Sequence, residues 1–414
     1  MADQNSYSAA EMSRLGTSGM SRNVGYGINK VFAAELLSTL TRSKSLIGLI
    51  LGVEGLFGVV VNPLFGHLSD RYTSRFGRHR LYVLLSTPIA GLLWLGFTYA
   101  KTFDLAVVFL VTFYLMQQVP LSPYQAWMPT IIEPKDWGRA SGVLNLWWQL
   151  GNLLAFLPIP LIWEFFHSAA FWVSAIIMIA GGLIAGLTVR DTTVKPVRFA
   201  QAGPGARRRF NANLRKYFVG QMLWWLAFEA IASFFTLFVI HSLHGSVIDS
   251  ALGMSSFTIS ATLVATAFGK KYKENSSRNL LVVLLIGFGL SAFFGLFVHS
   301  VYPAFVLLFL SGIFWGGIQV VSYPWGSELL RQASRGMTEP NSDFGLLYGI
   351  INFAQSLGLL VAAPITGAVI SLSHGSYSSM FWVSVASSFA AAASIALVTN
   401  DQTSAVGDVL SPDE

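Results

Sequence analysis

Twelve long apolar runs divide this chain, and they constrain its fold more than any other feature. Most of them approach or exceed the ~20 residues that an α-helix needs to cross the hydrocarbon core of a bilayer. We predict membrane-spanning helices over residues 22–40, 45–66, 81–100, 105–127, 140–163, 169–189, 217–242, 247–268, 279–299, 301–325, 344–371 and 377–399. The first run is the most polar of the twelve. We keep it as a span because an even number of spans places both termini on the same side.

Composition supports a membrane protein and excludes several other classes. Charged residues make up only 11% of the chain, against about 25% in soluble domains, which is too few to cover a surface facing water. The chain has no cysteine and its 7 histidines are scattered, so we expect no disulfide, no metal site and no cofactor. We find no hydrolase, kinase, dinucleotide-binding or ATP-binding motif. The sequence therefore predicts a protein that is not an enzyme and that draws its energy from an ion gradient.

Lysine and arginine alternate between the two sides of the predicted helices. Of the 26 basic residues, 20 lie in residues 67–80, 128–139, 190–216, 269–278 and 326–343. Cytoplasmic loops of membrane proteins are enriched in Lys and Arg, so we expect these segments and both termini in the cytoplasm. The net charge of +6 is then a signal of topology, and we predict no nucleic-acid partner. Short loops are typical of a bacterial cytoplasmic membrane protein.

The two halves of the chain repeat a pattern. Gly142-Val-Leu-Asn145 is followed by Gly151, and Gly349-Ile-Ile-Asn352 is followed by Gly358 at the same spacing. We therefore expect a duplicated six-helix unit, with substrate bound at the interface between the halves. The predicted division is an N-terminal tail (1–21), a six-helix bundle (22–189), a central loop (190–216), a second bundle (217–399) and a C-terminal tail (400–414).

The segment from Gly66 to Arg80 reads G-H-L-S-D-R-Y-T-S-R-F-G-R-H-R. It resembles the loop G-x-x-x-D-R-x-x-x-R-x-G-R-[RK] that the major facilitator superfamily carries between its second and third helices, although His79 interrupts the last basic pair. In that family the loop acts as a latch that holds the two halves in one conformation. The alternative is that the loop only anchors the topology of the chain in the membrane. The expected latch residues are Gly66, Asp70, Arg71, Arg75, Gly77, Arg78 and Arg80. The resemblance implies an all-α fold of twelve helices in two pseudo-symmetric six-helix bundles.

Two further segments resemble one branch of that superfamily, the glycoside–pentoside–hexuronide and sucrose/proton symporters. They are Val61-Asn62-Pro63 before Gly66, and residues 123–129 followed by Arg139-Ala-Ser-Gly142. Sodium-coupled members carry acidic residues at the positions of Asn62 and Gly58, where a hard cation binds. Both positions are uncharged here, so the resemblance implies coupling to protons.

Lys30, Glu35, Glu54 and Glu229 are ionisable residues that fall within predicted spans. Charges inside a membrane are costly and usually face a cavity or a partner. Loss of water favours the neutral form of a carboxyl group, so these carboxyls are candidates for carrying the coupling proton, with Lys30 as their counter-charge. Interhelical ion pairs of purely structural value are the alternative, and Glu35 lies nearest a span end.

Sugars bind through amide or carboxylate hydrogen bonds and aromatic faces. The candidate substrate-binding residues are Gln117, Asn145, Trp148, Gln149, Trp224, Trp225, Gln319, Asn352 and Gln355. The sequence therefore predicts a monomeric secondary transporter in the lipid bilayer that couples protons to a small-molecule substrate, with sugar symport as the leading function. The alternatives are an exporter of a drug, pigment precursor or lipid-like compound, or a non-transporting assembly factor.

Overall fold

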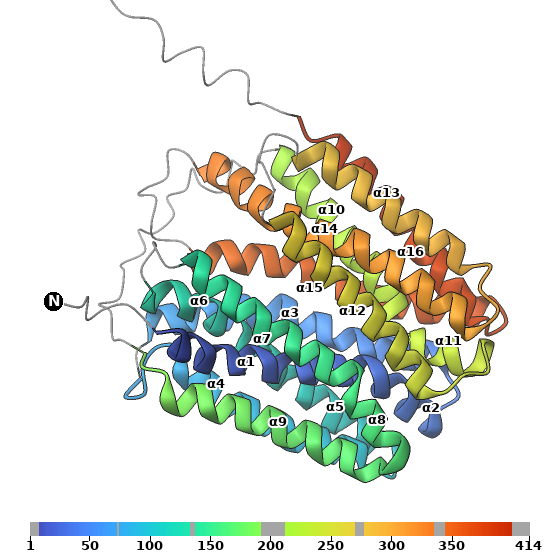
Figure 1. The fold of residues 1–414 in the computed structure, drawn as a ribbon, viewed down its shortest axis with the longest axis horizontal. Helices are drawn as coiled ribbons and strands as arrows, with labels where there is room; N and C mark the ends of the chain where they lie inside the picture. The colour runs from blue at the N-terminus through green and yellow to red at the C-terminus, as the bar shows by residue number, and fades with distance from the viewer. Residues whose placement is uncertain are drawn as a thin grey trace, which may run out of the picture.

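The structure is a computed structural model that describes residues 8–72, 74–132, 137–191, 212–269, 277–334 and 344–399. Regular structure within these ranges is helical, apart from one isolated bridge between Ser74 and Gly77. The helices run side by side and form two groups, one from each half of the chain (Figure 1).

The N-terminal half supplies the blue-to-green group in Figure 1. Its helices are α1 (Ala9–Ile28), η1 (Asn29–Ala33), α2 (Ala34–Leu40), α3 (Lys44–Arg71), α4 (Arg80–Thr98), α5 (Phe103–Gln118), α6 (Leu121–Ile131), α7 (Trp137–Phe156), α8 (Pro158–Phe165) and α9 (His167–Thr188). The C-terminal half supplies α10 (Ala212–Ala232), α11 (Phe235–Ser242), α12 (Val247–Gly269), α13 (Ser277–Gly295), α14 (Val301–Ser334), α15 (Phe344–Leu372), η5 (Tyr377–Ser379) and α16 (Met380–Ala396).

These helices combine into the twelve expected spans. In the part of the chain that the structure describes, 11 helical segments are long and apolar enough to cross a membrane. The twelfth is the continuous helix of α1, η1 and α2, which is too polar to meet the same criterion. Three spans are interrupted once, and two of these interruptions lie at Pro120 and Pro158, because proline has no N–H for the helix ladder. The predicted all-α fold of two six-helix bundles is confirmed.

The first span begins earlier in the structure than residue 22, where the apolar run starts. α1 begins at Ala9, and Ser8 and Glu11 form a capping box in which each side chain bonds the backbone N–H of the other. This arrangement satisfies two N–H groups that a helix start otherwise leaves without partners. The helix therefore extends well beyond the apolar run.

The two ends of the bundle differ in what they carry. We call the end that holds residues 74–79 and 189–191 the basic end, and the end that holds the α2–α3 turn the opposite end. The basic end is at the left of Figure 1 and the opposite end at the right. α1, α7, α10 and α15 start at the basic end, while α3 and α12 start at the opposite end.

The halves meet along α3 and α15, which pack closely over their length. Glycines on α3 make this approach possible. A Cβ atom added at Gly48 would collide with the backbone of Ala363, and one added at Gly55 would collide with the backbone of Leu360. Small residues at such crossings let two backbones approach closely within a membrane.

The internal repeat has a direct structural counterpart. Gly151 of α7 packs against the backbone carbonyl of Met20 in α1, and Gly358 of α15 packs against that of Met222 in α10. In each half the same crossing glycine therefore joins the fifth span to the first span of its own bundle.

Candidate functional site

A buried lysine lies between two carboxylates from different parts of the fold. Lys30 Nζ lies 3.2 Å from Glu54 Oε2 and also pairs with Glu229 Oε1. Glu54 belongs to α3 of the same half, whereas Glu229 belongs to α10 of the other half. The three side chains are between 3% and 6% exposed. Three of the candidate coupling residues therefore form one network across the two halves.

Polar groups around this charge network complete its hydrogen bonding. Ser233 Oγ donates to Glu229 Oε1 at 2.8 Å, and the Tyr26 hydroxyl donates to Oε2 of the same carboxylate at 3.4 Å. Asn29 Nδ2 donates to Glu54 Oε2 at 3.4 Å, while its Oδ1 accepts from the Tyr114 hydroxyl at 2.9 Å. A buried charge is tolerated when such donors replace water.

Sequence reasoning did not select these four supporting residues, although their spacing offered a signal. Tyr26 precedes Lys30 by one helical turn, and Ser233 follows Glu229 by one turn, so each pair shares a helix face. Asn29 is adjacent to Lys30. Tyr114, on a separate span, could be recognised only from the packing of α5 against the first span.

Lys30 sits in an irregular turn. Residues Asn29–Ala33 form a π-helix between two α-helical segments, a rare geometry that occurs mainly as a single turn inserted in an α-helix and frequently at functional sites. The insertion rotates the helix after it relative to the helix before it. Among the described residues, this single π turn contains Lys30, the lysine of the buried charge network.

Glu35 lies outside the network. It is half-buried in α2 and accepts a hydrogen bond of 3.4 Å from Ser38 Oγ one turn later. Nothing in the described part of the chain places it in an ion pair with Lys30. Of the candidate coupling residues, the structure brings together Lys30, Glu54 and Glu229 and leaves Glu35 near a span end.

Two of the predicted substrate-binding amides bridge the halves. Asn352 Nδ2 of α15 donates to Gln125 Oε1 of α6 at 2.6 Å, and Gln149 Nε2 of α7 donates to Thr262 Oγ1 of α12 at 2.9 Å. Gln125 was not predicted. It lies between two aromatic residues of α6, a context that is typical of a packed core.

The other predicted amides are dispersed. Gln117 is buried beside Gly25, and its Nε2 has no hydrogen-bond partner among the described residues. Asn145 is exposed on α7, Gln319 is half-buried on α14, and Gln355 is half-buried on α15. They lie on four different helices, and their role in binding a substrate stays a prediction.

The three predicted tryptophans have different surroundings. The indole of Trp148 faces the guanidinium of Arg22, whose Cζ lies 5.5 Å from the ring centroid. Trp224 is 1% exposed and packs edge-on against Tyr217 at 5.8 Å, so it belongs to the core of the C-terminal half. Trp225 points into an apolar cluster shared by both halves.

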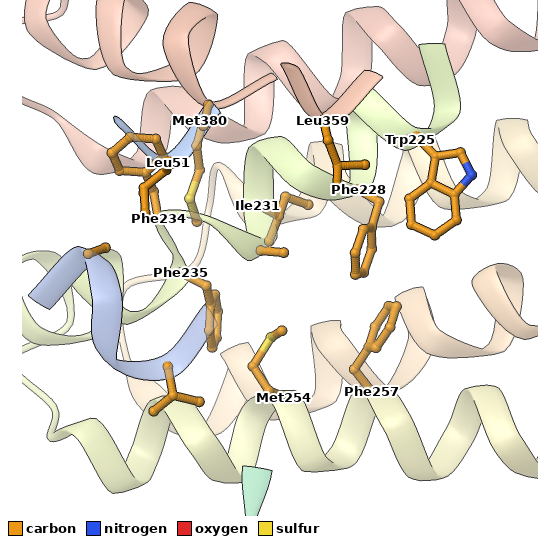
Figure 2. Packing of buried hydrophobic residues seen from close by; sticks show 14 of the residues in the cluster. Leu51, Trp225, Phe228, Ile231, Phe234, Phe235, Met254, Phe257, Leu359 and Met380 are labelled. Carbon is orange, nitrogen blue, oxygen red and sulfur yellow. The ribbon is translucent and has the colours of Figure 1, made fainter. Parts of the chain in front are cut away.

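Figure 2 shows this cluster around α10 and α12. Trp225 packs edge-on against Trp315 at 5.0 Å, and Phe228 stacks on the same ring at 4.4 Å. Phe257 of α12 lies 5.5 Å from Phe228. The same buried cluster extends to Leu51 of the N-terminal half.

The predicted latch segment is attached to its own half. Arg80 donates to the carbonyl of Leu187 at 3.0 Å and to that of Gly186, both in the last turn of α9, where the helix dipole favours a cation. Arg78 is buried and donates to the Ser69 carbonyl at 3.4 Å. The side chains of Asp70 and Arg71 lie outside the described residues.

Asp191, which sequence reasoning did not select, anchors this segment. Its Oδ2 accepts hydrogen bonds from the backbone N–H of His79 at 2.6 Å and of Arg80 at 3.1 Å, and its Oδ1 lies 3.3 Å from His79 Nδ1. Burial alone would raise the pKa of the Asp191 carboxyl, but the contacts with His79 and Arg80 hold that pKa below its ordinary value. Gly77 has a φ of +107°, and a Cβ there would strike Asp191, so glycine is required.

The remaining latch candidates are peripheral to this anchor. Gly66 packs against Ser122 of α6, where an added Cβ would lie 3.3 Å from the serine Cβ. Arg75 is exposed, and its Cζ lies 4.7 Å from the ring of the neighbouring Phe76. The described contacts of the segment therefore connect elements of the N-terminal half, and its role as a latch between halves stays a prediction.

The fold and the sequence together identify the class of protein. Residues 15–338 match the sequence profile of the Major Facilitator Superfamily, which covers most of the chain. The chain belongs to this family of membrane transporters, and it is a multi-pass integral membrane protein.

Individual relatives are more distant. A segment is 26% identical over 154 residues to the sucrose transport protein SUC3 of Arabidopsis thaliana, a match that spans 32% of this chain and 26% of that protein. Among solved structures, a point mutant of the nucleoside transporter NupG superposes with a TM-score of 0.74 at 13% identity, covering 94% of this chain and 100% of NupG. A bacterial homologue of the human lysosomal transporter Spinster gives a TM-score of 0.67 at 15% identity, covering 93% and 97%. These structural similarities concern the fold.

Proposed function

We propose that this chain is a proton-coupled symporter of a sugar or glycoside that works by alternating access between its two halves. The observation that carries the proposal is the buried Lys30, which is shared by Glu54 of its own half and Glu229 of the other half. A proton bound by either carboxylate changes the charge balance at the contact between the halves. Ion occupancy and the relative position of the halves are thereby linked.

The proposed substrate class rests on the polar groups between the halves and on the partial relative. Amides such as Gln125, Gln149 and Asn352 supply directional donors and acceptors, and Trp148 offers an aromatic face beside the Arg22 guanidinium. Sugars are recognised by this combination of groups. The partial relative, a sucrose transport protein, matches only 32% of the chain, so it supports this choice without deciding it.

We also propose the orientation that the charge pattern predicts. Both termini and the basic end would face the cytoplasm of a bacterium, with residues 22–189 and 217–399 as the moving halves of a monomer. The chain has no cysteine, so single introduced cysteines near Gly142 at the basic end and Ser45 at the opposite end would report sidedness in intact cells. Labelling of Gly142→Cys from outside by an impermeant thiol reagent would contradict this orientation.

Proton-coupled symport is tested with purified protein in liposomes that contain a pH dye. A panel of mono- and disaccharides that includes sucrose is added outside, under an imposed potential that is negative inside. We expect internal acidification that depends on both sugar and protein and disappears in protein-free liposomes. No acidification with any sugar, from protein shown to be folded, would contradict the proposal.

One observation favours a second candidate, export of an apolar compound. Trp225 and Phe228 pack with Trp315 into one aromatic cluster, and Figure 2 shows Trp225 and Phe228 among the buried apolar residues. Such surroundings suit a drug, pigment precursor or lipid-like compound. Proton-driven efflux of a lipophilic dye from inverted vesicles, without sugar-dependent acidification, would favour this candidate. Absence of both activities would favour an assembly factor.

A further inference from the structure

The two carboxylates that share Lys30 are supported unequally. Glu229 receives donors on both oxygens, with Lys30 and Ser233 at Oε1 and the Tyr26 hydroxyl at Oε2. A carboxylate that is ionised can only accept hydrogen bonds, and it is stabilised by each donor it receives. These donors therefore stabilise the ionised form of Glu229 on both of its oxygens.

Glu54 is supported on one side only. Lys30 Nζ at 3.2 Å and Asn29 Nδ2 at 3.4 Å both contact its Oε2. None of the described residues donates to its Oε1. The side chain is 6% exposed, and Oε1 is not fully buried, so an incoming proton or water molecule can reach this oxygen.

A count of charges shows that the network is not neutral when both carboxyl groups are ionised. One lysine then faces two carboxylates, which leaves one negative charge in excess. The other titratable side chains that face Glu54 are the phenols of Tyr26 and Tyr114, which supply no positive charge. α15, which packs along α3, contains no Asp, Glu, Lys, Arg or His. A buried excess charge is costly, so the site requires one cation from outside.

We propose that Glu54 takes up the coupling proton, one in each cycle, while Glu229 stays ionised and paired with Lys30. This assignment rests on the proposed proton-coupled function. The proton binds Glu54 Oε1, the oxygen that lacks a donor, and forms a neutral carboxylic acid. It later leaves the same oxygen as a proton, so no other bond forms or breaks.

Uptake at Glu54 changes the contact between the halves. With Glu54 neutral, the ammonium of Lys30 interacts with one full negative charge, that of Glu229 on α10. With Glu54 ionised, the same ammonium is shared between two anions, one of which lies in its own half. Protonation of Glu54 therefore strengthens the ion pair that joins the halves, and release of the proton weakens it.

The assignment can be tested without a known substrate. Infrared difference spectra of the purified full-length protein in detergent, recorded as the pH is changed, detect the C=O stretch of a protonated carboxyl group. We expect one buried carboxyl band that titrates in the wild type, is absent in Glu54→Gln and persists in Glu229→Gln. Glu35→Gln, which removes a carboxylate of the same membrane region outside the network, is the matched control and keeps the band.

A band that is lost in Glu229→Gln and kept in Glu54→Gln would overturn the assignment. Glu54→Asp guards against loss of the band through misfolding, because this variant keeps a carboxyl group and is expected to keep a titrating band at a shifted frequency. An unshifted band in Glu54→Asp would also contradict the proposal, since the band would then belong to another residue.

Transport measurements separate this assignment from the proposed function. If wild-type liposomes show acidification with sucrose or another sugar of the panel, Glu54→Gln is expected to lose this acidification. The variant should still move labelled sugar down its concentration gradient. Retention of acidification in Glu54→Gln would overturn the assignment alone. If the wild type shows no acidification with any sugar, the proposed symport fails, whereas the infrared result still decides where a proton binds.

Discussion

Lys44 of α3 crosses to the other half of the molecule and contacts the turn after α15. Its Nζ lies 4.4 Å from the centroid of the Tyr377 ring and donates to the Gly375 carbonyl at 2.8 Å. The ring of His241 also stacks on Tyr377, nearly parallel to it, with the ring centroids 5.5 Å apart. These contacts join the halves at the opposite end of the bundle, far from the predicted latch segment.

Replacement of Lys44 by alanine is expected to open this end more often. A cation–π contact contributes about 0.5–1 kcal/mol at exposed sites, so the open population should rise about fivefold for a loss of 1 kcal/mol. A cysteine at Ala363, which is buried against Gly48 of α3, reports the opening through its rate of thiol labelling. Lys101→Ala, at an exposed lysine of the same end, should leave that rate unchanged, and an equal rate in Lys44→Ala would contradict the prediction.

Loss of the bond between Asn352 and Gln125 should have its effect at the basic end. Asn352→Ala removes a hydrogen bond between the halves that contributes roughly 0.5–1.5 kcal/mol, so a cysteine at Ser356, which faces Gly58, should label faster. Ser371→Ala removes the hydrogen bond of 2.8 Å to Ser45 at the opposite end. This second variant should increase labelling at Ala363→Cys but not at Ser356→Cys. The same response at both positions would mean that the two ends do not open separately.

Lys30→Met is expected to destabilise the protein strongly, because it leaves Glu54 and Glu229 facing each other without a cation. Removal of one partner from a buried ion pair costs about 3–5 kcal/mol. The double variant Lys30→Met with Glu229→Gln should recover part of this loss, since only one carboxyl then remains and it can be neutral. Thermal unfolding in detergent measures both effects, with Lys101→Met as a surface control. A double variant that is no more stable than Lys30→Met would show that the two groups are not coupled.

The fold could be predicted from the sequence because its determinants are local. Runs of apolar residues predict each span, and the alternation of basic loops predicts the direction in which each span crosses the bilayer. The start of α1 was missed because it depends on the capping box of Ser8 and Glu11, a polar signal that lies outside the apolar run. A search for capping pairs before the first span would detect it.

The candidate site was only partly predictable, because its geometry comes from contacts between distant segments. Lys30, Glu54 and Glu229 stand out as charges in apolar runs, yet their meeting depends on the packing of η1, α3 and α10. Lys30 and Glu229 are separated by 199 positions, and no periodicity within one helix relates them. Asp191 was missed for the same reason, since its partners lie on the segment before α4 and it has no motif of its own.

The anchor of the basic segment gives a prediction for pH. Asp191→Asn removes the charge that accepts from His79 and Arg80, and a lost hydrogen bond to a buried charged group costs about 1–3 kcal/mol, so its unfolding temperature should be lower than that of the wild type near neutral pH. Because folding lowers the pKa of the Asp191 carboxyl, its stabilising effect is complete above the unfolded pKa, about 3.9, and is lost as the pH falls through the lower folded value. The difference in unfolding temperature between wild type and variant, measured in detergent, should therefore shrink as the pH falls below about 4. Asp104→Asn, at an exposed residue in the first turn of α5, controls for loss of a surface charge. A difference that does not shrink below about pH 4 would mean that Asp191 is not held as an anion by the segment from His79 to Arg80.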